Sequence, residues 1–176
     1  MKTYKQDELH SSIEFKIKHL MISNVRGRFG KFNVTIMSDS KDFSDAKIYC
    51  EIFVSSIDTG IKDRDNHLRS EDFFDVKKYP TMNFYSKDIE KLDDKGNFKI
   101  TGSLRIKDRS VPVILNATYN GKDVDNYNNE KHGFDIDAKI KRSDWDLDFN
   151  IKGGKNTLLI GDDVTIDISI QLMRAD

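Results

Sequence analysis

The segment VTIDISIQL, residues 164–172, carries an apolar residue at every second position and a polar residue between each pair. Successive side chains of a β-strand point to opposite faces, so this spacing gives one apolar face and one polar face. Antiparallel sheets with one solvated face have this pattern, whereas strands buried on both faces read as continuous apolar runs. The segment therefore predicts an antiparallel strand with one face against an interior and the other in water.

Similar alternation extends along most of the chain. It is clear in three further segments, residues 13–18, 98–106 and 134–141. Weaker strands are expected at residues 32–37, 47–55, 81–89 and 111–120. Turn-forming segments separate them, and no helical repeat or linker interrupts the series. A total of about eight strands predicts an all-β fold, a closed antiparallel barrel or a sandwich, in a single domain spanning residues 1–176.

The apolar faces of the clear strands carry no charged residue. Two interpretations fit this observation. The first is an ordinary packed core, as in any β-domain. The second is a barrel with an apolar ligand inside, because about eight strands is the size at which a barrel is either filled by side chains or wide enough for one small ligand. The alternation alone leaves both open.

Composition excludes several classes of protein. The 176 residues include 29 basic and 30 acidic side chains, so the net charge of −1 gives no electrostatic basis for binding nucleic acid. The sequence has no run of 18 apolar residues, so no transmembrane helix is predicted. The N-terminus has no apolar signal-peptide core, so we expect a cytoplasmic protein, or a periplasmic one if a signal peptide has been removed. A single cysteine, Cys50, forms no intrachain disulfide.

One charge-dense segment, DRDNHLRSEDFFDVKKYP at residues 63–80, departs from the alternation. His67 lies four residues after Asp63, which would place the two side by side on a helix. No second histidine or cysteine stands at ligand spacing, and a lone histidine without a nucleophile is no catalytic constellation. We therefore expect neither a metal site nor a catalytic residue here.

The same segment fits a helical crossover between strands. Residues 61–69 are expected to be helical, and Ser70 reads as the N-cap of a second short helix. Leu68, Phe73 and Phe74 would point inward and pin the crossover to the barrel. The charged side chains would form a network near one end of the barrel: Asp63, Arg64, Asp65, His67 and Arg69.

Residues 47–55 place apolar side chains on both faces of one strand. Cys50 is expected to point inward as a small core residue rather than a nucleophile. Tyr49 and Phe53 fall on the outer face, where two aromatic side chains favour a homodimer contact. Farther along the chain, Arg142 and Asp144 are expected to form an ion pair at the rim.

Several sequence blocks, in order, resemble one known family. The N-terminal block is His10-Ser11, Phe15, His19 and Val25-x-Gly27-x-Phe29. The central block is Ser56-Ile57-Asp58-Thr59, then Arg64-Asp65-x-His67-Leu68-Arg69-Ser70-x-Asp72-Phe73-Phe74-Asp75-Val76, Tyr79-Pro80 and Phe84. The later positions are Gly102-x-Leu104, Pro112-Val113, Phe134, Arg142-Ser143-Asp144 and Asp163-Val164. Over essentially its whole length the chain is similar to the YceI-like family of lipocalin-like, polyisoprenoid-binding bacterial proteins.

The resemblance implies an extended, lipocalin-like antiparallel barrel with a short helical crossover, often dimeric. It implies a non-enzymatic protein that carries or sequesters a long apolar ligand: a polyisoprenoid or quinone isoprenoid chain, or a fatty-acyl amide. An enzyme acting on a lipid-like substrate in the same cavity, or a packed stress-related interaction domain, are the alternatives. No cofactor other than the lipid and no metal is expected. Family members often have a glycine in the turn before Pro112, where this chain has none, which leaves the shape of that turn open.

The resemblance makes the inward rows candidates for lining the ligand. They are Ile13, Phe15, Ile17, Ile48, Cys50, Ile52, Phe84, Phe98, Ile100, Leu104, Ile106, Phe134, Ile136, Ala138, Ile140, Ile166, Ile168 and Ile170. Three polar residues are candidates for contacting a ligand head group: His19, Arg64 and Arg142.

Overall fold

The computed structural model describes residues 1–149 and 160–175. Its elements in chain order are β1 (Lys2–Gln6), η1 (Glu8–His10), β2 (Ser12–His19), β3 (Ser23–Phe29), β4 (Phe32–Ser38), β5 (Lys47–Phe53), η2 (Val54–Ser56), β6 (Ile57–Asp58), α1 (Lys62–Arg69), β7 (Thr81–Lys91), β8 (Asn97–Ile106), β9 (Arg109–Val124), β10 (Glu130–Lys141), η3 (Arg142–Trp145) and β11 (Ile160–Arg174). The η elements are single 3-10 turns.

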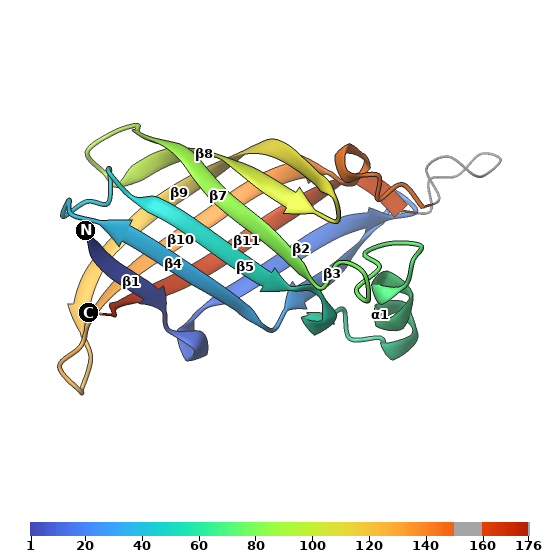
Figure 1. The fold of residues 1–176 in the computed structure, drawn as a ribbon, viewed down its shortest axis with the longest axis horizontal. Coiled ribbons are helices and arrows are strands. Elements are labelled where there is room, and N and C mark those ends of the chain that lie inside the picture. The colour runs from blue at the N-terminus through green and yellow to red at the C-terminus, as the bar shows by residue number, and fades with distance from the viewer. Residues whose placement is uncertain (150–159, 176) are drawn as a thin grey trace.

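Eight strands close into an antiparallel barrel, which Figure 1 shows from the side. The order around the ring is β1-β4-β5-β7-β8-β9-β10-β11, and β11 pairs back onto β1. Tyr4 lies opposite Arg174 in this closing pair. The prediction of an all-β antiparallel barrel of about eight strands is therefore confirmed.

Strand β11 closes the ring through two different partners. Its C-terminal part pairs with β1, whereas its earlier part pairs with β2. The 3-10 turn η1 separates β1 from β2. Asp7 caps this turn, because its side chain accepts a hydrogen bond of 3.1 Å from the backbone N–H of Leu9. The β2–β3 hairpin consequently extends the wall at one end of the barrel, where β3 also pairs with the short β6.

The crossover between β6 and β7 holds one α-helix, as expected, and α1 lies beside the end of the barrel in Figure 1. The second short helix is wrong: residues 71–74 form turns. Ser70 instead ends α1, since its hydroxyl donates a 2.6 Å hydrogen bond to the carbonyl of His67. Phe73 is buried, and Leu68 and Phe74 pack against the core, as predicted.

The charged side chains of the crossover bind mainly backbone and hydroxyl groups. Arg64 donates to the carbonyl and hydroxyl of Thr59, both at 2.7 Å. Buried Asp65 accepts from the N–H of Thr59 at 2.9 Å, and Arg69 donates to the carbonyl of Ile57 at 2.8 Å. Of the described ion pairs, the one in this segment joins His67 to Asp72 at 2.7 Å. The expected network is therefore a set of hydrogen bonds that fastens α1 to the loop before it.

The β8–β9 turn keeps its tight form without a glycine. Lys107 takes the left-handed conformation there, with φ of 57°. Glycine would adopt this conformation at less cost than lysine does.

Candidate functional site

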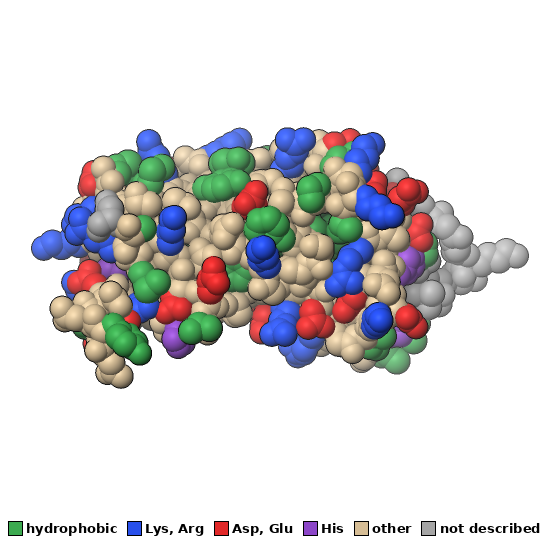
Figure 2. All heavy atoms as spheres, turned by 60° about the horizontal axis from the view of Figure 1, so that its bottom comes forward, with side chains coloured by type: hydrophobic (Ala, Val, Ile, Leu, Met, Phe, Trp, Pro, Cys, Tyr) green, Lys and Arg blue, Asp and Glu red, His purple; other side chains and the backbone are tan. Residues whose placement is uncertain are grey.

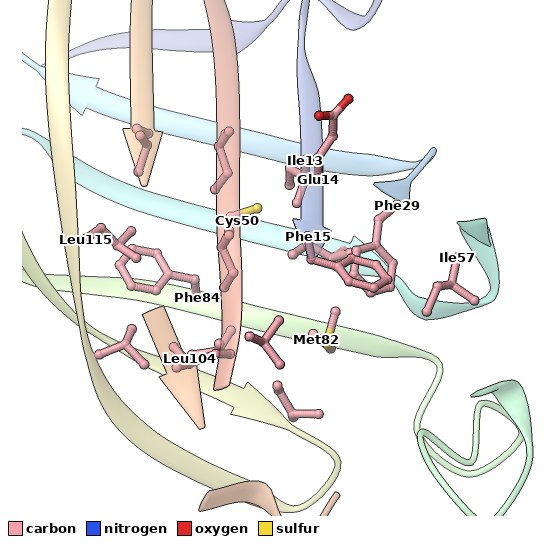
Figure 3. A pocket seen from close by; sticks show the side chains of 18 of the residues that line it. Ile13, Glu14, Phe15, Phe29, Cys50, Ile57, Met82, Phe84, Leu104 and Leu115 are labelled. Atoms are coloured by element: carbon pink, nitrogen blue, oxygen red, sulfur yellow. The ribbon is translucent and has the colours of Figure 1, made fainter. Parts of the chain in front are cut away.

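The barrel encloses a cavity of about 670 Å³. This volume falls in the usual range for small-molecule sites, about 300–1,000 Å³. Apolar side chains from strands far apart in the sequence point into one space, as Figure 3 shows for Phe15, Cys50, Phe84 and Leu104. The interior is therefore hollow, which the alternation alone could not establish.

The structure brings the candidate lining residues together on the cavity wall. All of them except Ala138 line it. Ala138 is buried on the same strand row but does not line the cavity. Which of these residues touch a ligand stays a prediction.

Sequence reasoning missed many lining residues. Those on the wall strands include Val34, Ile36, Met82, Val113, Leu115 and Ala117. Their even spacing on β4, β7 and β9 was a usable signal, because residues two apart on a strand share a face. Phe43 and Trp145 come from outside the strands and had no such signal.

Two glycines let aromatic rings lie flat on the barrel wall. Gly27 stands opposite Phe15 in the β2–β3 pair, and a Cβ atom built on Gly27 would lie 2.4 Å from the Phe15 ring. A Cβ atom built on Gly102 in β8 would likewise lie 2.4 Å from the Phe84 ring. A side chain at either position would force the ring to move. These glycines therefore keep bulky rings close to the wall.

One end of the barrel is closed by an aromatic cluster. Phe43, from the β4–β5 loop, is buried there. Its ring centroid lies 5.0 Å from those of Tyr4 and His132 and 5.2 Å from that of Phe134. Edge-to-face pairs at such distances are favourable. His132 donates or accepts at Tyr119 and Glu130, both at 3.0 Å, and its burial lowers its pKa, which favours the neutral ring.

The opposite end is polar and reaches the surface. We call it the mouth and define it by six cavity-lining residues: His19, Thr59, Asp63, Arg64, His67 and Arg142. His19, Asp63 and His67 are exposed although they line the cavity, so solvent meets the cavity here. The His67 ring lies 4.9 Å from the Phe149 ring, which brings α1 against the segment after η3. All three head-group candidates therefore lie at one end.

Arg142 holds the mouth together through the backbone. Its guanidinium is buried and donates to the carbonyls of Leu147 and Gly161 at 2.8 Å, Phe149 at 3.0 Å and Ile160 at 3.1 Å. Burial lowers its pKa. The expected ion pair with Asp144 is wrong, because no ion pair joins these two residues, both of which are described. The guanidinium instead bridges the two chain segments that flank residues 150–159.

Beyond the mouth, the cavity offers little for catalysis. Cys50 lines it, but burial raises the pKa of this thiol to about 12, so the reactive thiolate is not populated near neutral pH. Glu14 borders the cavity from an exposed position, and its carboxylate points away from the Phe15 ring in Figure 3. Among the described residues, no group of three or more His, Cys, Asp or Glu side chains is arranged to hold a metal ion.

The outer aromatic residues of β5 are partly covered by the chain itself. The Tyr49 ring contacts the Tyr85 ring in a tilted arrangement with centroids 4.8 Å apart, and the Lys31 ammonium lies 4.8 Å from the Phe53 ring centroid. Figure 2 shows charged side chains of both signs and scattered hydrophobic ones over one face of the molecule. The homodimer stays a prediction.

A closed antiparallel barrel with an apolar interior and one polar mouth defines the class of lipocalin-like binding barrels. Residues 4–172 match the YceI-like domain, and the chain belongs to that family. A UPF0312 protein of Staphylococcus epidermidis is 34% identical over 172 residues, which cover 97% of each chain.

Solved structures agree with this fold. The Campylobacter jejuni YceI protein has 36% identity and a TM-score of 0.76, covering 92% of this chain and 91% of its own. Burkholderia cenocepacia BcnA has 26% identity and a TM-score of 0.80, with 94% and 98% covered. A polyisoprenoid-binding domain from Saccharophagus degradans, implicated in plant cell wall breakdown, shares the fold at 16% identity and a TM-score of 0.68, with 99% of each chain covered.

Proposed function

We propose that this protein binds a long apolar lipid with its tail in the cavity and its head group at the mouth, and carries or sequesters it unchanged. The ligand class is a polyisoprenoid or quinone isoprenoid chain, or a fatty-acyl amide. The observation that carries the proposal is the 670 Å³ apolar cavity whose polar lining residues, apart from Glu14, are gathered at the mouth. The polyisoprenoid-binding domain of the same fold supports the ligand class.

The cavity volume sets the size of the tail. Liquid water takes about 30 Å³ per molecule and a methylene group is of similar size, so 670 Å³ holds about 20 carbon atoms. Burying each methylene contributes about 0.8 kcal/mol, or roughly 16 kcal/mol in total. Association and ordering of the ligand cost about 4–15 kcal/mol. Apolar burial therefore supplies the affinity without a strong polar contact.

The polar mouth sets the direction of the tail. Arg64 and His67 have part of their hydrogen-bonding capacity directed to Thr59 and Asp72, and His19 is exposed. An amide, quinone or phosphate head group would meet these donors and water there. At the other end the buried Phe43 stops the tail.

Two experiments test the proposal. Organic extraction and mass spectrometry of protein purified from a bacterial host should show about one lipid per chain, and an empty extract would refute it. Ile136→Asp places a charge in the cavity and should abolish lipid retention while the barrel stays folded. Lys139→Asp, exposed on the same strand, is the matched control and should retain lipid. Unfolding of Ile136→Asp, with no lipid in the wild type, would indicate a packed core instead.

A further inference from the structure

The β2–β3 turn presents three consecutive apolar side chains to solvent. Leu20, Met21 and Ile22 are 42%, 60% and 83% exposed. Single exposed apolar residues are common on protein surfaces. Three in a row at the tip of a hairpin give the molecule a projecting apolar point, which we call the tip.

The backbone of the tip disfavours the residues that occupy it. Leu20 and Met21 take left-handed conformations, with φ of 52° and 59°. Glycine, asparagine or aspartate is usual at such positions in hairpin turns, and the left-handed conformation is energetically costly for other residues. Because these side chains are exposed, packing within the barrel does not offset that cost. Strain retained in this way points to a contact outside the chain.

Basic side chains stand directly behind the tip on the outer face of the same hairpin. Lys16 lies opposite Arg26 in the β2–β3 pair, and Lys18 follows one step nearer the tip. Like charges placed opposite each other on a sheet repel. Among the described ion pairs none involves these three residues, and Glu14, the nearest acid on β2, lies farther from the tip. With a net charge of −1 for the whole chain, this basic collar is a local feature.

The apolar tip, with basic side chains behind it, is complementary to the surface of a lipid bilayer that has an apolar interior and anionic head groups. Apolar side chains enter the boundary between head groups and acyl chains, and nearby lysine and arginine side chains are attracted to anionic lipids. A stable contact with a second copy of the chain needs about 800 Å² on each partner, far more than three side chains present. Among the described residues no helix is long and apolar enough to cross a membrane.

The tip adjoins the mouth. His19 lines the cavity and is followed directly by Leu20, and its strand partner Ile160 is one of the carbonyl acceptors of Arg142. In Figure 1 the ends of β2 and β10 lie at the same end of the barrel. We propose that the tip docks the protein onto anionic lipid bilayers and so places the mouth where lipid tails can enter. This inference rests on the proposed lipid-binding function.

The test compares binding to sedimented vesicles of phosphatidylcholine with and without phosphatidylglycerol. Wild-type protein should bind the anionic vesicles, and Met21→Asp/Ile22→Asp should bind them at least tenfold more weakly. Lys18→Glu/Arg26→Glu should lose the preference for phosphatidylglycerol. The control pair Leu92→Asp/Tyr127→Asp removes exposed apolar side chains elsewhere, 53% and 86% exposed, and should bind as wild type.

Several outcomes would overturn docking. The first is that wild type and Met21→Asp/Ile22→Asp bind the vesicles equally well. The second is that Leu92→Asp/Tyr127→Asp loses as much vesicle binding as the tip variant. The third is that the wild type binds no vesicles. Self-association of wild type that the tip variant abolishes, without vesicle binding, would assign the tip to a second copy. The lipid extracted from each purified variant separates this proposal from the first. Docking variants should keep bound lipid, whereas an empty wild-type barrel would refute lipid binding itself.

Discussion

Replacing Gly27 with alanine should narrow the cavity without breaking the barrel. The new Cβ would lie 2.4 Å from Cζ of Phe15 and 2.9 Å from each Cε atom. Carbon atoms in contact sit about 3.5–4.0 Å apart, so the ring must retreat by roughly 1–1.5 Å. The other face of the ring borders the cavity, and the retreat is therefore inward. Space for about one methylene group, ~30 Å³, is lost.

The loss of binding affinity in Gly27→Ala should depend on ligand length. One methylene is worth about 0.8 kcal/mol, so the longest ligand that fills the wild-type cavity should bind about fourfold more weakly. Shorter ligands should bind as before, because they leave space unused. Displacement of cis-parinaric acid by geraniol, farnesol and geranylgeraniol measures this series. Overpacking should also lower the free energy of unfolding by about 1–3 kcal/mol.

Two controls make the result decisive. Gly133→Ala places a Cβ 3.8 Å from Asn120, an ordinary contact, and should leave the series unchanged. Phe15→Leu added to Gly27→Ala removes the displaced ring and should restore binding of the longest ligand. An equal loss for every length, or no loss at all, would show that the ring does not limit the cavity.

Three further changes address other parts of the molecule. Phe43→Ala should lower the free energy of unfolding in urea by about 3 kcal/mol and favour longer isoprenols, and an unchanged length preference would contradict its role as a stop. Asp7→Asn should melt below wild type at neutral pH. Hydrogen bonding from Lys131 lowers the pKa of Asp7 from 3.8 to about 2, so the wild-type advantage is complete above pH 4 and disappears as the pH falls through about 2. A gap that persists at pH 2 would exclude this ionisation as its source. Arg142→Lys should lower the free energy of unfolding by about 3 kcal/mol, because one ammonium cannot donate to all four carbonyls. An unchanged Tm would argue against the bridge.

Alternation predicted most of the strands, including the weaker ones that correspond to β4, β5, β7 and β9, but it did not predict β1 and β3. The apolar rows run without a break from Phe134 to Ile140 in β10 and from Val164 to Leu172 in β11, and β8 keeps the alternation on both sides of Gly102. The inward row of β3 contains Gly27, which breaks the pattern for the same reason that it makes room for Phe15. β1 has one apolar residue, Tyr4, among polar neighbours. Its place in the sheet depends on pairing with β4 on one side and with β11, at the other end of the sequence, on the other side.

The site was predictable where strand parity determines it. Parity places side chains on the inner face, but the distance between opposite walls depends on how the whole sheet closes. The stop at Phe43 comes from a loop, where parity has no meaning. The partners of Arg142 are carbonyl groups, which every residue carries, so the sequence suggested Asp144 instead.

The pairing of Tyr4 with Arg174 has a consequence for biosynthesis. The first strand of the barrel can pair with β4 early, but its second neighbour, β11, is available only after nearly the whole chain has left the ribosome. Contacts this far apart in sequence form late, because the intervening chain must be ordered first. A nascent chain therefore has an open sheet whose apolar face is exposed. The enclosed cavity forms only when translation is almost finished. Under the proposed function, a lipid would enter the completed barrel or be enclosed as β11 pairs with β1.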